Sequence, residues 1–452
     1  MNPLPKEFVE SILSLFPKDA GYFFDALSNN SITSVRLNSA KKSNAFQNET
    51  PIEWCSQGKY LAERHSFIMD PLLHAGAYYV QESSSMFLEA CIKSLPLAEN
   101  TIALDLCAAP GGKSTLIIDT LPKNSLLVSN EIIKSRVNVL QENLIRWGAP
   151  NFVVTNNDPK TFSKAGAIFD LIVVDAPCSG EGLWRKDNNA MNEWSMANVV
   201  LCEARQERIL RDILPCLKPG GFLIYSTCTF NDIENEKLVE KLLLDQKLKP
   251  YPINIPGEWP CKTGDNFQFR FLPHLVKGEG LFIAILQKPN EQDDSNKHQK
   301  RAGLNFAPKK SLPELHQWLS NPTYFDYFIE NDFVFAFPKL LIPIYEIIRS
   351  TLYLKHAGIC MGKFDKTGKL IPEHSLAMST ALNPQIQKYG LNREEALNYL
   401  QKGNIKPPGN ELNGWCLACY EGLALGWLKV LPNRVNNYFP SEYRILKDIQ
   451  ID

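Results

Sequence analysis

The sequence predicts an α/β protein whose central part is a doubly wound, mostly parallel sheet. Between residues 70 and 288, short apolar stretches of strand length alternate with stretches of helical periodicity. A glycine-rich turn, residues 105–115, directly follows the first of these strands. The chain has 452 residues, 44% of them hydrophobic, so it is long enough to form several domains with their own cores.

Six segments with strand-like composition define the predicted sheet. They span residues 101–106, 125–130, 152–156, 169–175, 221–226 and 280–286. Helical patterns fill the intervals, which is typical of βαβ units. In open sheets of this kind, ligands bind outside the carboxyl ends of the strands. The residues that follow each segment are therefore the candidates for a functional site.

Two smaller regions flank the predicted sheet. Residues 1–70 mix short helical and strand-like patterns, which predicts a small α/β cap before the main domain at 71–289. Residues 290–310 are polar and charged, and we interpret them as a linker. Residues 311–452 contain a short helical pattern and then several short strands with glycine turns, so they predict a compact C-terminal region that is mainly β.

Composition limits the cellular setting of the protein. Eleven cysteines are scattered without regular spacing, and the N-terminus lacks the charged-then-apolar order of an export signal, so we expect a reduced, cytoplasmic protein. The apolar stretch 340–348 is interrupted by Pro343 and is too short to span a membrane, so we expect no membrane contact. The net charge of −1 neither supports nor excludes RNA as a partner.

The glycine-rich turn at 105–115 resembles a phosphate-binding loop only in part. The leading glycine of that motif would be Cys107, and Pro110 lacks one of the backbone N–H donors that such a loop uses. A nucleoside triphosphatase is therefore disfavoured. Gly111 and Gly112, placed between a strand and a helix, still allow the backbone to approach a ligand closely.

Two acidic residues follow the next strands. Glu131 lies about 25 residues after Asp105, at the distance where a carboxylate binds ribose hydroxyls in dinucleotide-type sites. Asp158 follows the third strand and is placed to accept a hydrogen bond from an exocyclic amine. Each carboxylate is equally compatible with a plain loop cap, so both interpretations stay open.

Two cysteines at strand ends, Cys178 and Cys228, are the strongest candidates for chemistry. Either thiol alone is more often a small buried apolar residue than a nucleophile. A pair beside a cofactor turn suits methylation of cytosine C5, because C5 becomes nucleophilic only after a thiolate adds to C6. Asp175, three residues before Cys178, is placed to protonate or hydrogen-bond N3, or else to form an ion pair with Lys113.

A zinc site in the C-terminal region is the main competing motif. Cys416 and Cys419, with His356 and Cys360, provide four potential ligands. An offset of three residues directs the first two thiols to opposite faces of a strand, so we expect no metal.

Five motifs together resemble the Sun-type (NOL/NOP/Sun) RNA cytosine-C5 methyltransferases. They span residues 79–85, 106–115, 175–187, 225–229 and 270–282. The resemblance implies a Rossmann-like class I core, S-adenosylmethionine as methyl donor, Cys228 as covalent nucleophile and Cys178 as the residue that helps to release the product. Glu82 stands where Asp is common in the family, and this exchange of one carboxylate for another leaves the resemblance intact.

The resemblance also implies a set of residues around the cofactor. These are Cys107, Ala108, Ala109, Pro110, Gly111, Gly112, Lys113, Glu131, Arg136, Asp158 and Asp175.

The two ends of the chain narrow the resemblance to one subfamily. Residues 34–38 resemble the family's RNA-side cap, and residues 358–363 and 425–440 resemble the PUA-like module of the RsmF type, which modifies small-subunit ribosomal RNA. The likeness implies a monomer that acts on 16S ribosomal RNA or on the assembling 30S particle, with Lys429 and Arg434 among the candidates for RNA contacts. The alternatives are a tRNA cytosine-C5 methyltransferase, a non-catalytic ribosome-assembly factor, and a DNA cytosine methyltransferase with Cys178 as nucleophile.

Overall fold

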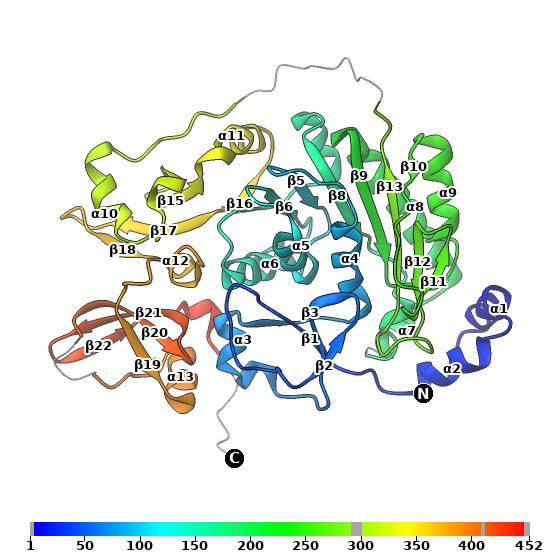
Figure 1. Ribbon diagram of the computed structural model, residues 1–452, viewed down its shortest axis with the longest axis horizontal. Helices are drawn as coiled ribbons and strands as arrows, with labels where there is room; N and C mark the ends of the chain where they lie inside the picture. Colours follow the sequence, from blue (N-terminus) through cyan, green and yellow to red (C-terminus); the bar gives the residue numbers. More distant parts are fainter. Residues whose placement is uncertain (1–3, 187, 291–300, 408–411, 447–452) are drawn as a thin grey trace.

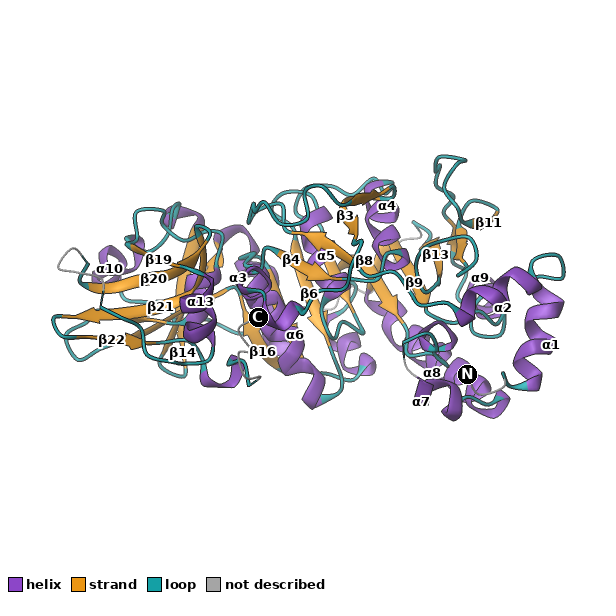
Figure 2. Ribbon diagram, turned by 90° about the horizontal axis from the view of Figure 1, so that it is seen from below, coloured by secondary structure: helices purple, strands orange, loops and turns teal. Residues whose placement is uncertain are grey.

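A computed structural model of the protein describes residues 4–186, 188–290, 301–407 and 412–446. The C-terminal strands, the large central sheet and the N-terminal helices lie in a row (Figure 1, Figure 2). No helix in these ranges is both long and apolar enough to cross a membrane.

The large sheet has ten strands and confirms the predicted doubly wound core. Its order is β11-β12-β13-β9-β8-β5-β6-β7-β16, with β10 paired to β13. The six predicted strands are β5 (Ile102–Asp105), β6 (Leu126–Asn130), β7 (Phe152–Thr155), β8 (Phe169–Asp175), β9 (Leu217–Thr227) and β13 (Leu281–Gln287). The first five run parallel, and β13 is antiparallel to β9. The strand order reverses between β5 and β8, and such a switch point is where open sheets bind ligands.

Helices cover both faces of this sheet, because alternate strand residues point to opposite sides and both sides are apolar. Leu104 and Ile172 pack on one face with Leu210 of α8 (Met196–Ile213), together with α9 (Glu236–Asp245). Ala103 and Val173 pack on the other face with α4 (Leu88–Lys93), α5 (Gly112–Thr120) and α6 (Lys134–Trp147). The rim of the sheet is thereby held between two closed apolar layers.

The two edges of the sheet are antiparallel. One edge consists of β10 (Lys249–Pro250), β11 (Lys262–Gly264) and β12 (Gln268–Phe271). The other edge is β16 (Leu354–Ala357), which comes from the C-terminal region and pairs with β7. The ring of His356 stacks on Phe152 with centroids 5.3 Å apart. The C-terminal region therefore completes the sheet, a contact that the sequence pattern did not predict.

The N-terminal cap contains α1 (Lys6–Leu15), α2 (Ala20–Ser28) and α3 (Pro71–Ala75). Its sheet has the order β2-β3-β1-β4, from β1 (Ser34–Leu37), β2 (Thr50–Ile52), β3 (Cys55–Tyr60) and β4 (Tyr78–Val80). Arg36 is almost fully buried, and its guanidinium donates to Asp119 (2.8 Å) and Thr115 (2.6 Å) of α5. A buried arginine needs such partners, so this contact fixes the cap to the helix that follows the glycine-rich turn.

The C-terminal region contains two four-stranded sheets. The first has β14 (Phe325–Glu330), β15 (Phe333–Pro338), β17 (Ile359–Phe364) and β18 (Leu370–Pro372), with α10 (Leu312–His316), α11 (Ile342–Thr351) and α12 (His374–Met378). The second has β19 (Lys388–Leu391), β20 (Gly414–Tyr420), β21 (Leu423–Leu431) and β22 (Arg434–Asn437), with α13 (Arg393–Leu400). The predicted mainly β character is confirmed.

Of the predicted linker at 290–310, residues 291–300 lie outside the described residues. Within its described part, Ala307 N–H donates to Tyr327 O of β14 at 2.8 Å, so this portion is held against the first C-terminal sheet. The predicted boundaries of the four regions stay a proposal.

Candidate active site

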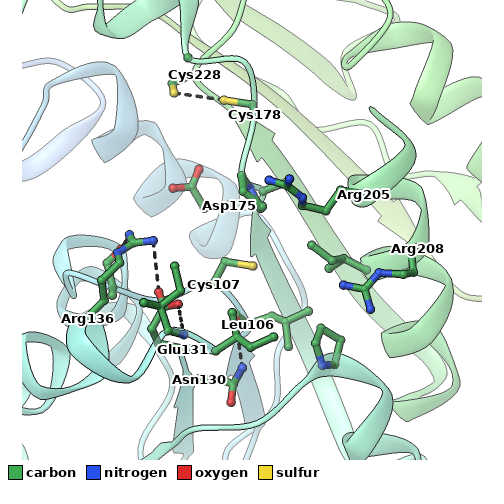
Figure 3. Close-up of a pocket in the computed structure, with 18 of the residues that line it drawn as sticks. Leu106, Cys107, Asn130, Glu131, Arg136, Asp175, Cys178, Arg205, Arg208 and Cys228 are labelled. Atoms are coloured by element: carbon green, nitrogen blue, oxygen red, sulfur yellow. Dashed lines mark hydrogen bonds and ion pairs between the residues drawn. The ribbon is translucent and has the colours of Figure 1, made fainter. Parts of the chain in front are cut away.

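The site lies at the carboxyl ends of β5, β8 and β9. Cys178 follows β8, Cys228 follows β9, and their sulfur atoms are 3.3 Å apart (Figure 3). The neighbouring positions arise because β8 and β9 pair in parallel, with Asp175 opposite Ser226. Two cysteines that are 50 residues apart in the sequence are thus brought into direct contact.

A buried carboxylate holds the loop that carries Cys178. Glu234 is fully buried and accepts four hydrogen bonds, from Ser179 N (3.0 Å), Ser179 Oγ (2.5 Å), Gln206 Nε2 (2.7 Å) and Asn231 Nδ2 (2.9 Å). Burial raises the pKa of Glu234, and the donors act in the opposite direction. The network fixes Ser179, the residue directly after Cys178.

A second carboxylate holds the loop that carries Cys228. Glu181 accepts hydrogen bonds from the backbone N–H groups of Phe230 (2.6 Å) and Asn231 (3.0 Å). Gly182 N–H donates to Cys228 O at 2.8 Å, and a Cβ at position 182 would lie only 2.7 Å from that oxygen. Glycine is therefore required at 182 for the two loops to approach each other.

Asp175 and Lys113 form the charged part of the site. Lys113 Nζ is 2.8 Å from Asp175 Oδ2, and Ser226 Oγ donates to Asp175 Oδ1 at 2.8 Å. Burial lowers the pKa of Lys113, but the charge and hydrogen bond of Asp175, with smaller contributions from Cys228 and Asp105, together outweigh burial, so the pKa lies above its ordinary value. The ion pair that the sequence left as an alternative is present, and Asp175 also lines the cavities described below.

The first cavity has a volume of about 540 Å³ and opens beside β5, β6 and β8. Such a volume lies within the roughly 300–1,000 Å³ typical of small-molecule sites. Its polar lining residues are Asn130, Glu131, Arg136, Asp175, Arg205 and Arg208 (Figure 3). Ile132 and Ile133 add apolar surface, since they line the cavity and are 50% and 47% exposed.

These residues fit S-adenosylmethionine. The Glu131 carboxylate stands at the carboxyl end of β6, accepts from Ile133 N–H at 2.9 Å and lies 3.5 Å from Arg136, which is a suitable place for ribose hydroxyls. The two isoleucines offer an apolar face for a base, and Asp175 offers a negative charge to a sulfonium. The bound cofactor supplies the methyl group.

The glycine-rich turn lies between two cavities. Cys107 and Ala109 line both, whereas Ala108, Pro110, Gly112 and Lys113 line a second cavity of about 380 Å³. Gly111 lines neither cavity; its φ of +117° lets the chain enter α5. Arg136 donates to Ala109 O at 2.7 Å and so braces the turn.

Asp158 is placed differently from Glu131. Its carboxylate accepts from Lys160 N–H at 3.0 Å, which caps the short 3₁₀ helix Pro159–Ala165, and it lies 3.5 Å from Arg208. Among the described residues it lines neither cavity, although Pro159 lines the first. Its observed contacts are those of the loop cap that the sequence left as an alternative.

The two cavities meet at the reactive groups. Both are lined by Cys107, Ala109, Asp175, Leu183 and Cys228, whereas Cys178 lines the first. The second cavity is also lined by Tyr79, Glu82, Lys186 and Glu279. This arrangement permits a methyl donor on one side of Cys228 and a planar base on the other.

Two thiols of the site, Cys178 and Cys107, have raised pKa values. The pKa of Cys178 is raised, first by its hydrogen bond with Cys228 and then by burial. Burial also raises the pKa of Cys107, which disfavours its reactive thiolate form. Asp105, buried beneath the turn and bonded to Ser114 Oγ at 2.6 Å, has its pKa raised to about 7 by burial.

Several lining residues were missed from the sequence. Asn130 ends a predicted strand, and Arg205 and Arg208 lie three apart on α8. The i, i+3 spacing places the two arginines on one helix face, but the same spacing occurs on many solvated helices. Among the described residues, no group of three or more ligand-type side chains is arranged to hold a metal.

The strand order, the glycine-rich turn and the carboxylate at the end of β6 define a Rossmann-like methyltransferase. Residues 92–287 match the family model of the 16S rRNA methyltransferase RsmB/F, residues 4–83 match the N-terminal domain of 16S rRNA methyltransferase RsmF, and residues 387–445 match the methyltransferase RsmF PUA domain.

Known proteins agree with these matches. The chain is 30% identical over 470 residues to the ribosomal RNA small subunit methyltransferase F of Aliivibrio fischeri (strain MJ11), with 97% of each protein covered. A solved methyltransferase homologue from Pyrococcus horikoshii is 25% identical, with a TM-score of 0.54 over 63% of this chain and 95% of that one. NSun6 from the same organism, solved with SFG, shares the fold at 21% identity, with a TM-score of 0.54 over 64% and 99% of the two chains.

The chain therefore belongs to the family of ribosomal RNA small subunit methyltransferase F. The predicted family, fold class and cofactor are confirmed, and the protein is an S-adenosylmethionine-dependent RNA cytosine-C5 methyltransferase.

Proposed function

We propose that the enzyme methylates a cytosine of 16S ribosomal RNA through a covalent bond between Cys228 and C6. The observation that carries the proposal is the pair of sulfur atoms 3.3 Å apart, with Cys228 on the wall between two cavities. The names of the relatives and the PUA match support ribosomal RNA as the substrate. The proposal includes a monomeric enzyme that acts in the cytoplasm, on naked RNA or on the assembling 30S particle.

The proposed reaction begins at the second cavity, where the target base would lie. Cys228 gives up its thiol proton as its Sγ bonds to C6, and Asp175, held by Lys113 and Ser226, directs a proton or a hydrogen bond to N3, which stabilises the charge that enters the ring. The C5 carbon then takes the methyl group. Release requires transfer of the C5 proton to a water molecule, return of the C–H electron pair to form the C5–C6 double bond, and departure of the Cys228 sulfur as a thiolate. We assign assistance in this step to Cys178.

Mutation of the two thiols tests these roles. Cys228→Ala should abolish methyl transfer while cofactor affinity stays near that of the wild type. Cys178→Ala should instead accumulate a covalent protein–RNA adduct, visible as a band of reduced mobility on a denaturing gel. Cys261→Ala is the matched control, because this thiol is half-buried and lies outside both cavities.

Each alternative predicts a different result. Turnover by Cys228→Ala would refute the assignment, and a DNA-type mechanism would make Cys178→Ala the inactive variant. A non-catalytic assembly factor would bind no S-adenosylmethionine. Bisulfite mapping of ribosomal RNA from cells with and without the protein identifies the modified cytosine. Loss of a methylation signal in tRNA instead would change the assigned substrate from ribosomal RNA to tRNA.

A further inference from the structure

Asn130, at the end of β6, connects the glycine-rich turn to the loop after β7. Its side-chain NH₂ donates to Leu106 O (3.1 Å) and Asn157 O (3.0 Å), and its side-chain oxygen accepts from Thr155 Oγ1 (2.8 Å) and Asn157 N–H (3.0 Å). Its backbone oxygen accepts from Ala108 N–H at 2.8 Å. Asn130 is buried, and it lines the first cavity. Its amide thereby fixes the turn from behind.

Asn157 extends this network to the C-terminal region. Its side-chain NH₂ donates to Tyr353 O at 2.9 Å, and its side-chain oxygen accepts from Tyr353 N–H at 3.0 Å. The neighbouring Asn156 N–H also donates to Tyr353 O at 3.2 Å. Tyr353 directly precedes β16. The two hydrogen bonds between the Asn157 side chain and the Tyr353 backbone therefore extend the β7–β16 pairing by one residue.

The path is continuous and buried. It runs from the backbone of Tyr353 through Asn157 and Asn130 to Ala108, and Asn157 is only 8% exposed. Both groups of the Asn157 side-chain amide are engaged with the backbone of the C-terminal region. Tyr353 as a whole is 62% exposed, and its contacts with Asn157 are made by its backbone N–H and C=O groups.

We infer that the C-terminal segment 301–386 supports the cofactor site from behind and that Asn157 is the positioning residue that links the two. This segment lies between the residues matched by the methyltransferase and PUA family models. It contributes no residue to the wall of the first cavity, but it holds the loop that holds Asn130. Preorganised binding groups strengthen affinity because less order must be gained on binding. The inference rests on the cofactor dependence of the family, not on the proposed covalent mechanism.

The test compares Asn157→Ala with Asn151→Ala in the full-length protein. Asn151 lies at the opposite end of β7, and its side chain donates to Ser125 O at 2.7 Å, so it provides an asparagine with a similar bond far from the carboxyl rim. Calorimetric titration with S-adenosylhomocysteine measures cofactor affinity directly. Asn157→Ala should weaken affinity roughly tenfold, whereas Asn151→Ala should change it less than about twofold.

Kinetics separate positioning from general damage. For Asn157→Ala, the KM for S-adenosylmethionine should rise while kcat at saturating cofactor stays within about twofold of the wild type. Hydrogen exchange at the amide of Ala108 should accelerate in this variant and not in Asn151→Ala. Unchanged affinity in Asn157→Ala, or an equal loss in both variants, would overturn the inference. Either result leaves the role of Cys228 intact, because adduct formation at saturating cofactor is measured independently.

Discussion

Replacing Glu234 with glutamine tests the network that holds the two thiol-bearing loops together. The carboxylate binds two donors at each oxygen: Ser179 N–H and Gln206 Nε2 at Oε2, and Ser179 Oγ and Asn231 Nδ2 at Oε1. Glutamine keeps one oxygen, so two of these donors lose their acceptor and face an NH₂ group. A buried donor without a partner costs about 1–3 kcal/mol, so the sum is about 2–6 kcal/mol.

Two effects move the expected loss of stability toward the lower end of this range. Ser179 Oγ is also 2.9 Å from Thr229 Oγ1, and Asn231 Nδ2 is 3.0 Å from Glu181 Oε1, so both groups have alternative partners. Burial raises the pKa of Glu234, which shows that burying its charge is unfavourable, and glutamine removes that charge. We therefore expect a loss of about 2–4 kcal/mol in the stability of this region.

The measurement is urea denaturation followed by tryptophan fluorescence, together with the rate of adduct formation in a Cys178→Ala background. Glu240→Gln is the matched control, because Glu240 is exposed on the neighbouring helix α9. Glu234→Gln should unfold at clearly lower urea and form the adduct more slowly, since the loops that align the sulfurs are loosened. An unchanged midpoint and rate, equal to those of the control, would refute the positioning role of the network.

Two further predictions concern the backbone at the site and the stability of the fold. Gly182→Ala places a Cβ 2.7 Å from Cys228 O, so kcat should fall at least about tenfold while calorimetric cofactor affinity is retained; a normal kcat would show that the loops have room to move apart. Burial lowers the pKa of His356 to about 4 and that of His374 to about 3, from 6.5. Both stay neutral in the folded state while the unfolded chain binds protons, so stability is full above pH 6.5 and decreases as pH falls toward 4. The loss between pH 6.5 and 5 is about 2 kcal/mol for each residue, measured as the urea midpoint, and His356→Phe should reduce this dependence.

Much of the sheet was predictable because its signals are local. Each of the six predicted strands is a short apolar run that ends at a polar residue or a turn, and such runs are buried on both faces of a parallel sheet. By contrast, β16 contains Lys355 and His356, and its partner β7 lies about 200 residues earlier in the chain. No periodicity within four residues identifies such a distant partner, so the closure of the sheet by the C-terminal region could not be predicted.

The residues of the candidate site were likewise predictable only in part. Asp175 ends a strand, and Glu131, Cys178 and Cys228 come within three residues after one, so the topology alone brings them to one rim. Asp158 gives the same signal in the sequence, yet its carboxylate caps a 3₁₀ helix, because the side chain of a loop aspartate can turn toward the N–H groups that follow it. The roles that the family resemblance assigned to these residues stay predictions until the variants are measured.

The surroundings of the two thiols give a physical reason for unequal roles. Cys178 donates to or accepts from Cys228, and this bond with burial raises the pKa of Cys178, so its proton is retained. Burial lowers the pKa of Lys113, but Asp175 and, to a smaller extent, Cys228 act against it, and a positive charge on Lys113 favours negative charge that develops on the Cys228 sulfur during attack. These contacts therefore favour Cys178 as the thiol that keeps its proton. Lys113→Met should slow adduct formation without preventing cofactor binding, and equal adduct rates in Lys113→Met and wild-type Lys113 would remove this electrostatic reason for the choice of nucleophile.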